Sequence, residues 1–182
     1  GTNLHELLVS ENRLPKERAI DFLLQIAKAL AAIHEQGIVH RDIKPDNIII
    51  RKDGIAKLVD LGLAKQTDPS KATTETTMGT PFYIAPELIS SPDKVDFRAD
   101  IYSLGATFYR MLTGRRPVEG ETPAEIIDNL VNGEPVSVQE IDYTISDDIA
   151  KLCRRMMHKD PAKRYMSMDM VVKAIDKILF ME

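Results

Sequence analysis

Hydrophobic residues recur every three or four positions through most of this chain. This spacing places them on one face of a helix, so each such stretch predicts an amphipathic helix. Pro15 and Gly37 suit the start and the end of the second helix. For His34, near that end, we expect a contact with the helix terminus rather than catalysis. Three of the predicted faces are Leu4, Leu7 and Leu8; Ile20, Leu23, Leu24, Ala27, Leu30 and Ala31; and Val171, Ala174, Ile175, Ile178 and Leu179.

Residues 98–113 are hydrophobic around most of the helix circumference, which is typical of a buried helix. Gly114 is suited to end it. Asp100 stands out there, because a carboxylate in a buried element is costly unless hydrogen bonds satisfy it. Two further helices are predicted to start at Thr122 and Ser146. We interpret the hydrophobic stripe of the second as core: Ile149, Leu152, Cys153, Met156 and Met157.

One segment breaks the helical pattern. Residues 48–50 and 55–59 are two hydrophobic runs separated by Lys52-Asp53-Gly54. An Asp-Gly pair between β-branched runs predicts a β-hairpin. The loops before and after this hairpin leave from the same end. Asp42, Asn47 and Asp60 are therefore predicted to lie in one neighbourhood.

These polar residues suit phosphoryl transfer. Asn47 and Asp60 offer the hard oxygen ligands that Mg²⁺ prefers. Asp42 is a further carboxylate that could orient or deprotonate a hydroxyl, and Lys44 is a compact cation suited to a phosphate. For any one of them alone, a polar loop with salt bridges is the better interpretation. The ordered set favours a catalytic site.

The same residues carry a family resemblance. The run His40-Arg41-Asp42-Ile43-Lys44-Pro45-Asp46-Asn47 resembles the catalytic loop of protein kinases. Asp60-Leu61-Gly62 resembles the magnesium-binding triplet, and Ala85-Pro86-Glu87 resembles the motif that closes the activation segment. The resemblance implies a mainly α-helical fold over residues 1–182, the C-terminal lobe of a eukaryotic-type serine/threonine kinase. A small β-hairpin would carry the catalytic and metal-binding loops. The Ile-rich hairpin looks closest to bacterial members.

The resemblance also implies ATP and Mg²⁺ as cofactors and a role for each residue. Asp42 would be the base or hydroxyl orienter, and Lys44 would stabilise the transferred phosphoryl group. Asn47 and Asp60 would hold Mg²⁺, and Ile49 would form the floor under the adenine ring. Leu61 stands where the family usually has Phe, which we interpret as a mild departure.

A threonine-rich segment follows the triplet. In the family, an arginine at the position of Arg41 pairs with a phosphorylated residue of this segment, since guanidinium binds phosphate bidentately. Gly79-Thr80-Pro81 resembles the substrate-facing loop of serine/threonine kinases. The resemblance implies that Thr80 contacts Asp42 and Lys44. The candidate phosphorylation sites are Thr73, Thr74, Thr76 and Thr77, with Thr76 and Thr77 as first choices.

Three residues would support the site. Asp100 would accept backbone N–H groups of the catalytic loop, which would explain a carboxylate in a buried helix. Arg164 lies in Asp160-Pro161-Ala162-Lys163-Arg164, which resembles a family motif whose arginine pairs with the glutamate of the activation segment. The resemblance therefore implies a Glu87–Arg164 ion pair.

The composition of the chain limits its class and its possible partners. The 182 residues are 43% hydrophobic and 29% charged, as in ordinary globular domains, and the net charge of −4 argues against a general nucleic-acid binder. The single cysteine, Cys153, excludes an internal disulfide and suits a reducing compartment, so we expect a cytoplasmic location. No hydrophobic run reaches membrane-spanning length. A longer parent protein could still be anchored through regions outside this sequence.

No Gly-x-Gly-x-x-Gly loop and no lysine-bearing strand precede His40. We therefore expect the N-terminal lobe of the same domain to be absent and to be a partner, and the isolated chain to have little activity. The other expected partner is a protein substrate with Ser or Thr. Two alternatives stay open: a pseudokinase or scaffold lobe without catalysis, and self-association through an uncovered cleft floor of Ile49, Val59 and Leu61.

Overall fold

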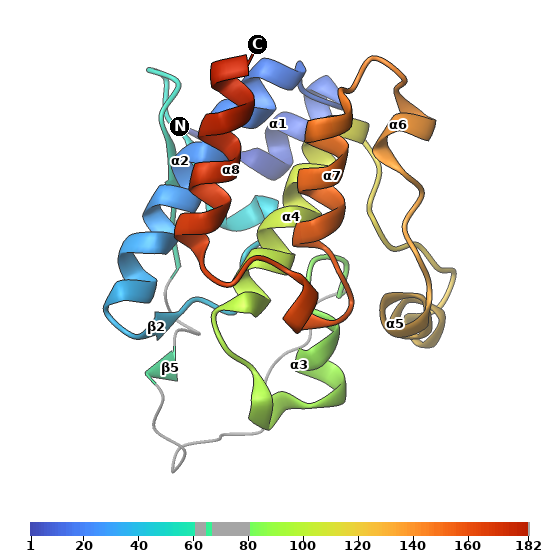
Figure 1. Cartoon of the computed structure of the whole chain (residues 1–182). Helices are drawn as coiled ribbons and strands as arrows, with labels where there is room; N and C mark the ends of the chain where they lie inside the picture. Colours follow the sequence, from blue (N-terminus) through green and yellow to red (C-terminus); the bar gives the residue numbers. More distant parts are fainter. Residues whose placement is uncertain (61–64, 67–80, 182) are drawn as a thin grey trace.

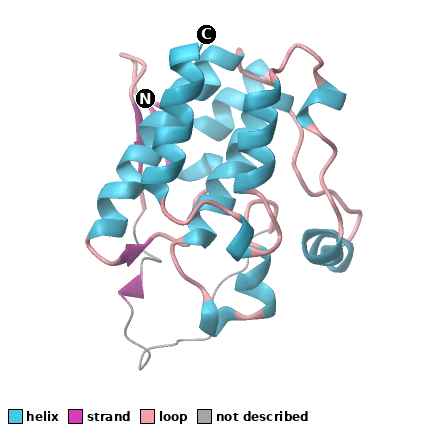
Figure 2. Ribbon diagram, viewed as in Figure 1, coloured by secondary structure: helices cyan, strands magenta, loops and turns pink. Residues whose placement is uncertain are grey.

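The computed structural model of the chain describes residues 1–60, 65–66 and 81–181, and helices dominate among them (Figures 1 and 2). This confirms the prediction of a mainly α-helical fold. The helices are α1 (Leu4–Glu11), α2 (Lys16–Glu35), α3 (Pro86–Ser90), α4 (Arg98–Thr113), α5 (Pro123–Asn132), α6 (Val138–Ile141), α7 (Asp147–Met156) and α8 (Met168–Met181). The strands are β1 (Thr2–Asn3), β2 (Ile38–Val39), β3 (Ile48–Ile50), β4 (Ala56–Leu58) and β5 (Lys65–Gln66).

Helix α4 lies at the centre of the hydrophobic core. It contacts α2 and α7, and α2 also contacts α8, so these four helices form the body of the molecule (Figure 1). Every residue of α4 except Arg98 and Arg110 is buried, as its hydrophobic circumference predicted. Gly105 permits the close approach of α7, because a Cβ at this position would lie 2.7 Å from Cβ of Met156.

Helix ends follow the local signals of the sequence. Asn3 caps α1 through a capping box in which its side chain accepts the N–H of Glu6. Gly37, with φ +72°, follows α2, and Gly114, with φ +71°, ends α4. The Ser146 side chain makes no capping hydrogen bond at the start of α7, although it occupies the position expected from the sequence.

The predicted hairpin is present. Strands β3 and β4 are antiparallel, with Ile48 opposite Leu58 and Ile50 opposite Ala56. Gly54, with φ +83°, supplies the left-handed residue of the turn. Strand β1 pairs with the other side of β3, and β2 pairs with β5. Strands β1, β2 and β5 have two residues each. A segment of two residues is too short to show the alternation of hydrophobic and polar residues that predicts a strand.

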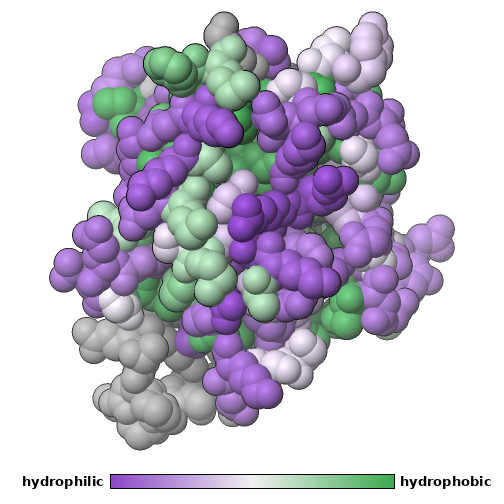
Figure 3. Space-filling view, viewed as in Figure 1, coloured by the Kyte–Doolittle hydropathy of each residue, from purple (hydrophilic) through white to green (hydrophobic). Residues whose placement is uncertain are grey.

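The surface is mainly hydrophilic in the view of Figure 3. Hydrophobic side chains gather where α8 ends, and Phe180 there is 93% exposed. None of the helices within the described residues is long and apolar enough to cross a membrane.

Candidate active site

The loop between β2 and β3 places three polar side chains in contact. The side-chain amide of Asn47 donates to both the backbone oxygen and carboxylate Oδ2 of Asp42, each at 2.8 Å. Lys44 Nζ lies 3.2 Å from the other carboxylate oxygen, Oδ1. The Asp42 carboxylate is therefore held from two sides. Its side chain is 24% exposed, so it is accessible to a reacting hydroxyl.

The hairpin brings Asp60 to the same end of the molecule. The N–H of Val59 donates to the backbone oxygen of Asn47 at 2.9 Å, and Asp60 is the next residue. The Asn47 amide nitrogen is engaged with Asp42, so its Oδ1 is not used in those bonds. An amide oxygen and a carboxylate are the donor types that Mg²⁺ prefers, and Asn47 and Asp60 supply one of each.

Two residues of this region have left-handed backbone conformations. Arg41 has φ +66° and Asp60 has φ +63°, and such conformations cost about 1–3 kcal/mol for residues with a side chain. Asp100 of α4 secures the first of them, since its carboxylate accepts the N–H of His40 and the N–H of Arg41, each at 2.8 Å. The Asp100 side chain is completely buried. The structure thus contains the backbone contacts that the resemblance implies for Asp100.

The structure assigns His34 a different contact from the expected one. Its Nε2 lies 2.8 Å from Oδ2 of Asp100, so its partner is the buried carboxylate and not the end of its own helix. The ring also packs near Phe97, with ring centres 5.8 Å apart. Sequence reasoning missed this contact, because 66 residues separate His34 from Asp100. His34 therefore belongs to the network through which Asp100 holds the backbone of His40 and Arg41.

Arg41, in the same loop as Asp42, has an unused polar atom. Its Nε is buried and has no hydrogen-bond partner among the described residues. A buried guanidinium nitrogen without a partner is costly, so an anionic side chain would fit there.

Several residues named in the sequence analysis lie outside the described residues: Leu61, Gly62, Thr73, Thr74, Thr76, Thr77 and Thr80.

Ile49 and Val59 lie on the hairpin next to these loops. Ile49 is only partly buried, whereas its neighbours Ile48 and Ile50 belong to the core. Val59 is 38% exposed. This is the alternation expected where one face of a strand is free to meet a ligand or another protein surface. The adenine contact of Ile49 and self-association through this face stay predictions.

A buried ion pair lies on the other side of α4. Arg164 Nη2 donates to Glu87 Oε2 at 2.8 Å, and Nη1 contacts Oε1 at 2.5 Å. The remaining guanidinium donors reach the backbone oxygens of Arg98, His158 and Lys159. The structure therefore contains the Glu87–Arg164 pair that the resemblance implies, and it ties α3 to the segment before α8.

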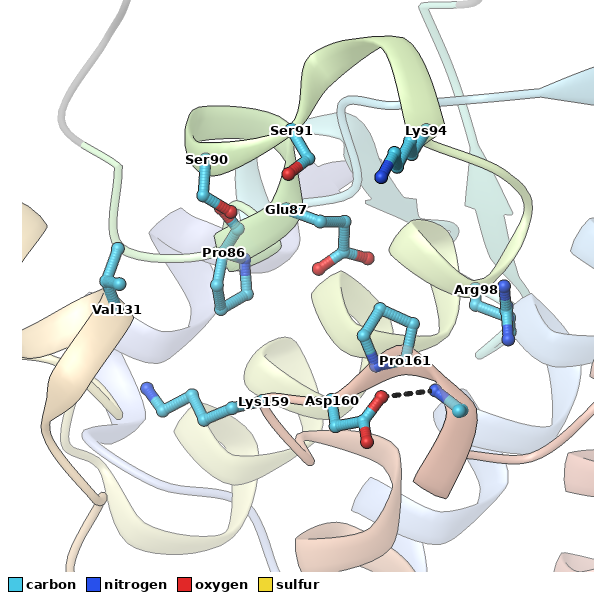
Figure 4. Close-up of a pocket in the computed structure, with 11 residues that line it drawn as sticks. Pro86, Glu87, Ser90, Ser91, Lys94, Arg98, Val131, Lys159, Asp160 and Pro161 are labelled. Carbon is cyan, nitrogen blue, oxygen red and sulfur yellow. Dashed lines mark hydrogen bonds between the residues drawn. The ribbon is translucent and has the colours of Figure 1, made fainter.

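A cavity of about 410 Å³ lies next to this pair (Figure 4). Pro86 and Glu87 of α3 line one side, and Asp160 and Pro161 line the opposite side (Figure 4). Asp160 uses its carboxylate to accept the N–H of Ala162 at 2.9 Å. The lining includes none of the loop residues from His40 to Asn47, so the cavity is separate from the candidate active site.

Comparison with known proteins identifies the family. The profile of the protein kinase domain matches residues 1–174 of this chain. The chain belongs to the protein kinase family. The buried Asp100 network and the Asp42–Asn47 contact both lie within the matched residues.

Bacterial kinases are among its relatives. A protein named as a probable serine/threonine-protein kinase of Clostridium perfringens is 34% identical over 98% of this chain. Serine/threonine-protein kinase pkn2 of Myxococcus xanthus is 36% identical over 90% of the chain, and PknB of Mycobacterium tuberculosis is 33% identical over 91%. The matches cover 26%, 21% and 27% of these three relatives' own lengths. The chain thus spans about a quarter of each relative.

Proposed function

We propose that the protein carrying this chain is a serine/threonine protein kinase. It transfers the γ-phosphoryl group of ATP to a Ser or Thr hydroxyl of a protein substrate. The observation that carries the proposal is the Asp42 carboxylate, held by Asn47 at 2.8 Å and by Lys44 at 3.2 Å. Membership of the kinase family and the names of the relatives support it.

Asp42 is the residue that acts on the substrate hydroxyl. It orients the hydroxyl and accepts its proton as the bond to phosphorus forms. Lys44, whose side chain is 38% exposed, is close enough to Asp42 to stabilise the negative charge on the transferred group. Asn47 and Asp60 would hold Mg²⁺, which neutralises phosphate oxygens when bound. Ile49 would lie under the adenine ring of ATP.

We propose further that residues 1–182 form a C-terminal lobe that needs an N-terminal lobe for activity. The printed sequence contains no Gly-x-Gly-x-x-Gly motif, which in kinases covers the nucleotide phosphates. The residues at the site position the hydroxyl and the metal. Residues 1–182 alone would therefore bind ATP weakly and transfer little phosphate.

Arg41 is the proposed receptor for a phosphorylated threonine. Its buried Nε has no hydrogen-bond partner among the described residues, and phosphothreonine offers a strongly charged acceptor. The candidate threonines are Thr73, Thr74, Thr76 and Thr77. Phosphopeptide mapping of the active full-length protein tests this step, and a map with none of the four modified contradicts it.

One assay tests the main proposal. The full-length protein is incubated with ATP, Mg²⁺ and a mixture of Ser, Thr and Tyr peptides, beside its Asp42→Asn variant and residues 1–182 alone. The expected result is Ser and Thr phosphorylation that falls by about 10³-fold in Asp42→Asn. Asp53→Asn is the control, because Asp53 lies at the hairpin turn and pairs with Arg51.

The other outcomes are informative. Full-length protein that binds partners without any Asp42-dependent transfer would identify a pseudokinase or scaffold. Rapid transfer by residues 1–182 alone would contradict the need for an N-terminal lobe. Equal transfer to tyrosine peptides would contradict the assignment to Ser and Thr.

A further inference from the structure

Three arginines lie together near the end of α4, and none forms an ion pair within the described part of the chain. Arg110 is in the last turn of α4, and Arg115 and Arg116 follow Gly114. Arginines without carboxylate partners leave positive charge available to an anionic ligand. Of the other eight arginines, Arg41, Arg154 and Arg155 also form no ion pair among the described residues, and five contact carboxylates: Arg13, Arg18, Arg51, Arg98 and Arg164.

Arg116 packs against the segment Phe82–Tyr83. The guanidinium carbon of Arg116 lies 3.7 Å from the centre of the Phe82 ring, which is a cation–π contact. Burial raises the pKa of the Tyr83 hydroxyl, whereas the positive charges of Arg110 and Arg116 lower it and the Asp46 carboxylate raises it. Arg116 therefore lies against the segment before α3.

Arg110 connects this cluster to the candidate active site. Its Nη1 donates to the backbone oxygen of Asn12, the residue that ends α1, at 3.1 Å, and α1 contacts residues 45–47 of the loop that carries Asp42. A substrate hydroxyl at Asp42 belongs to a peptide that advances about 3.3 Å per residue when extended. Side chains a few positions from the acceptor can therefore reach Arg110 and Arg116.

We propose that Arg110 and Arg116 select substrates with an acidic side chain close to the phosphorylated Ser or Thr. This inference rests on the proposed kinase function and names its substrate class. Neither guanidinium group has a carboxylate partner among the described residues, so both carry available positive charge, and guanidinium binds carboxylate with two hydrogen bonds. Arg110 is also held in place, since its Nη1 donates to the backbone oxygen of Asn12 at 3.1 Å. A lysine at the same substrate position is repelled.

The test uses the full-length protein and peptides that share one acceptor and differ only in Glu or Lys at the flanking positions. The wild type is expected to have a kcat/KM about tenfold higher for the Glu peptides, with a difference that shrinks as salt is added. Arg110→Gln/Arg116→Gln should remove the difference by raising KM for the Glu peptides. Its kcat and its KM for ATP should stay unchanged, which separates specificity from a structural defect.

Two further variants control this comparison. Arg116→Gln alone alters an exposed side chain and should remove part of the preference, which keeps the test informative where the double variant fails to fold. Arg154→Gln changes an exposed arginine of α7 and should leave the preference intact. Equal rates with both peptide sets in the wild type, or an equal loss in Arg154→Gln, would overturn the inference.

A binding measurement separates this inference from the kinase proposal. Glu and Lys peptides with Ala at the acceptor position are titrated by fluorescence anisotropy. Tighter binding of the Glu peptide, lost in the double variant, supports the inference even where no phosphoryl transfer is found, and in that case the kinase proposal fails. Phosphoryl transfer with no charge preference in either assay supports the kinase proposal and contradicts the inference.

Discussion

The buried carboxylate of Asp100 accepts the backbone N–H of Arg41 at 2.8 Å. It binds the N–H of His40 through its other oxygen, and His34 contacts that same oxygen. One side chain of α4 therefore fixes the backbone at the start of the loop that carries Asp42. The left-handed conformation of Arg41 makes this contact more important, because an unsupported backbone would leave that conformation.

Asp100→Asn is expected to lower the free energy of unfolding by about 2–4 kcal/mol. An amide has one acceptor oxygen, so one of the two N–H groups loses its partner inside the core. The reaction rate should fall as well, because Asp42 follows Arg41. Urea unfolding and kcat of the full-length protein measure both effects. The control is Asp93→Asn on an exposed turn, and equal effects in the two variants would contradict the role of Asp100.

Asn47→Asp is expected to reduce phosphoryl transfer by about 100-fold or more. The new carboxylate would face the Asp42 oxygens that the amide now contacts at 2.8 Å, and like charges repel. Steady-state kinetics at several Mg²⁺ concentrations measure the loss. Asn132→Asp is a matched control, since Asn132 donates to Asp128 at 2.8 Å on the exposed face of α5. Unchanged kinetics in Asn47→Asp would contradict the proposed site.

Arg164→Met is expected to destabilise the fold by about 3–5 kcal/mol, because it leaves the Glu87 carboxylate without its partner in a largely buried site. Glu87→Gln should cost less, and the double variant less than the sum. Chemical denaturation of all four proteins gives the coupling energy. The exposed Arg18–Glu11 pair, at 2.9 Å, is the matched control and should show a coupling below about 1 kcal/mol. Equal coupling in both pairs would be contrary to this expectation.

Cys153 provides a pH-dependent test of the core. Burial raises the pKa of its thiol from 9.0 to about 12. Between these two values the folded protein keeps a proton that the unfolded chain loses, so the stability of the fold decreases as pH rises through that range. Cys153→Ala should flatten this alkaline decrease in unfolding measurements, although the smaller side chain lowers stability at neutral pH.

The same burial protects the thiol from reagents. At pH 8, a disulfide reagent such as dithionitrobenzoate should react with Cys153 only after denaturant is added, because the thiolate is the reactive form. The absorbance change after urea unfolding serves as the positive control. Rapid reaction of the folded protein would show that the thiol is not in the core.

Much of this architecture follows from local patterns. The period of three to four residues predicts α1, α2 and α8, and the Asp-Gly pair predicts the β3–β4 hairpin, because each signal acts within a few residues of the chain. The polar residues of the site can be found in the same way, since Asp42, Lys44 and Asn47 share one loop. The two-residue strands β1, β2 and β5 give no such signal, because their pairing partners lie elsewhere in the sequence.

The sequence by itself therefore determined the longer helices, the hairpin and the family resemblance, and it supplied the candidate residues of the site. Tertiary structure decided what surrounds them. His34 and Asp100 meet across 66 residues, and Arg116 meets Phe82 only because the end of α4 returns to the segment before α3. Such contacts depend on how helices pack and not on local spacing. The physical reason is that burial of a charged or polar group is satisfied by whichever partner the folded chain brings near.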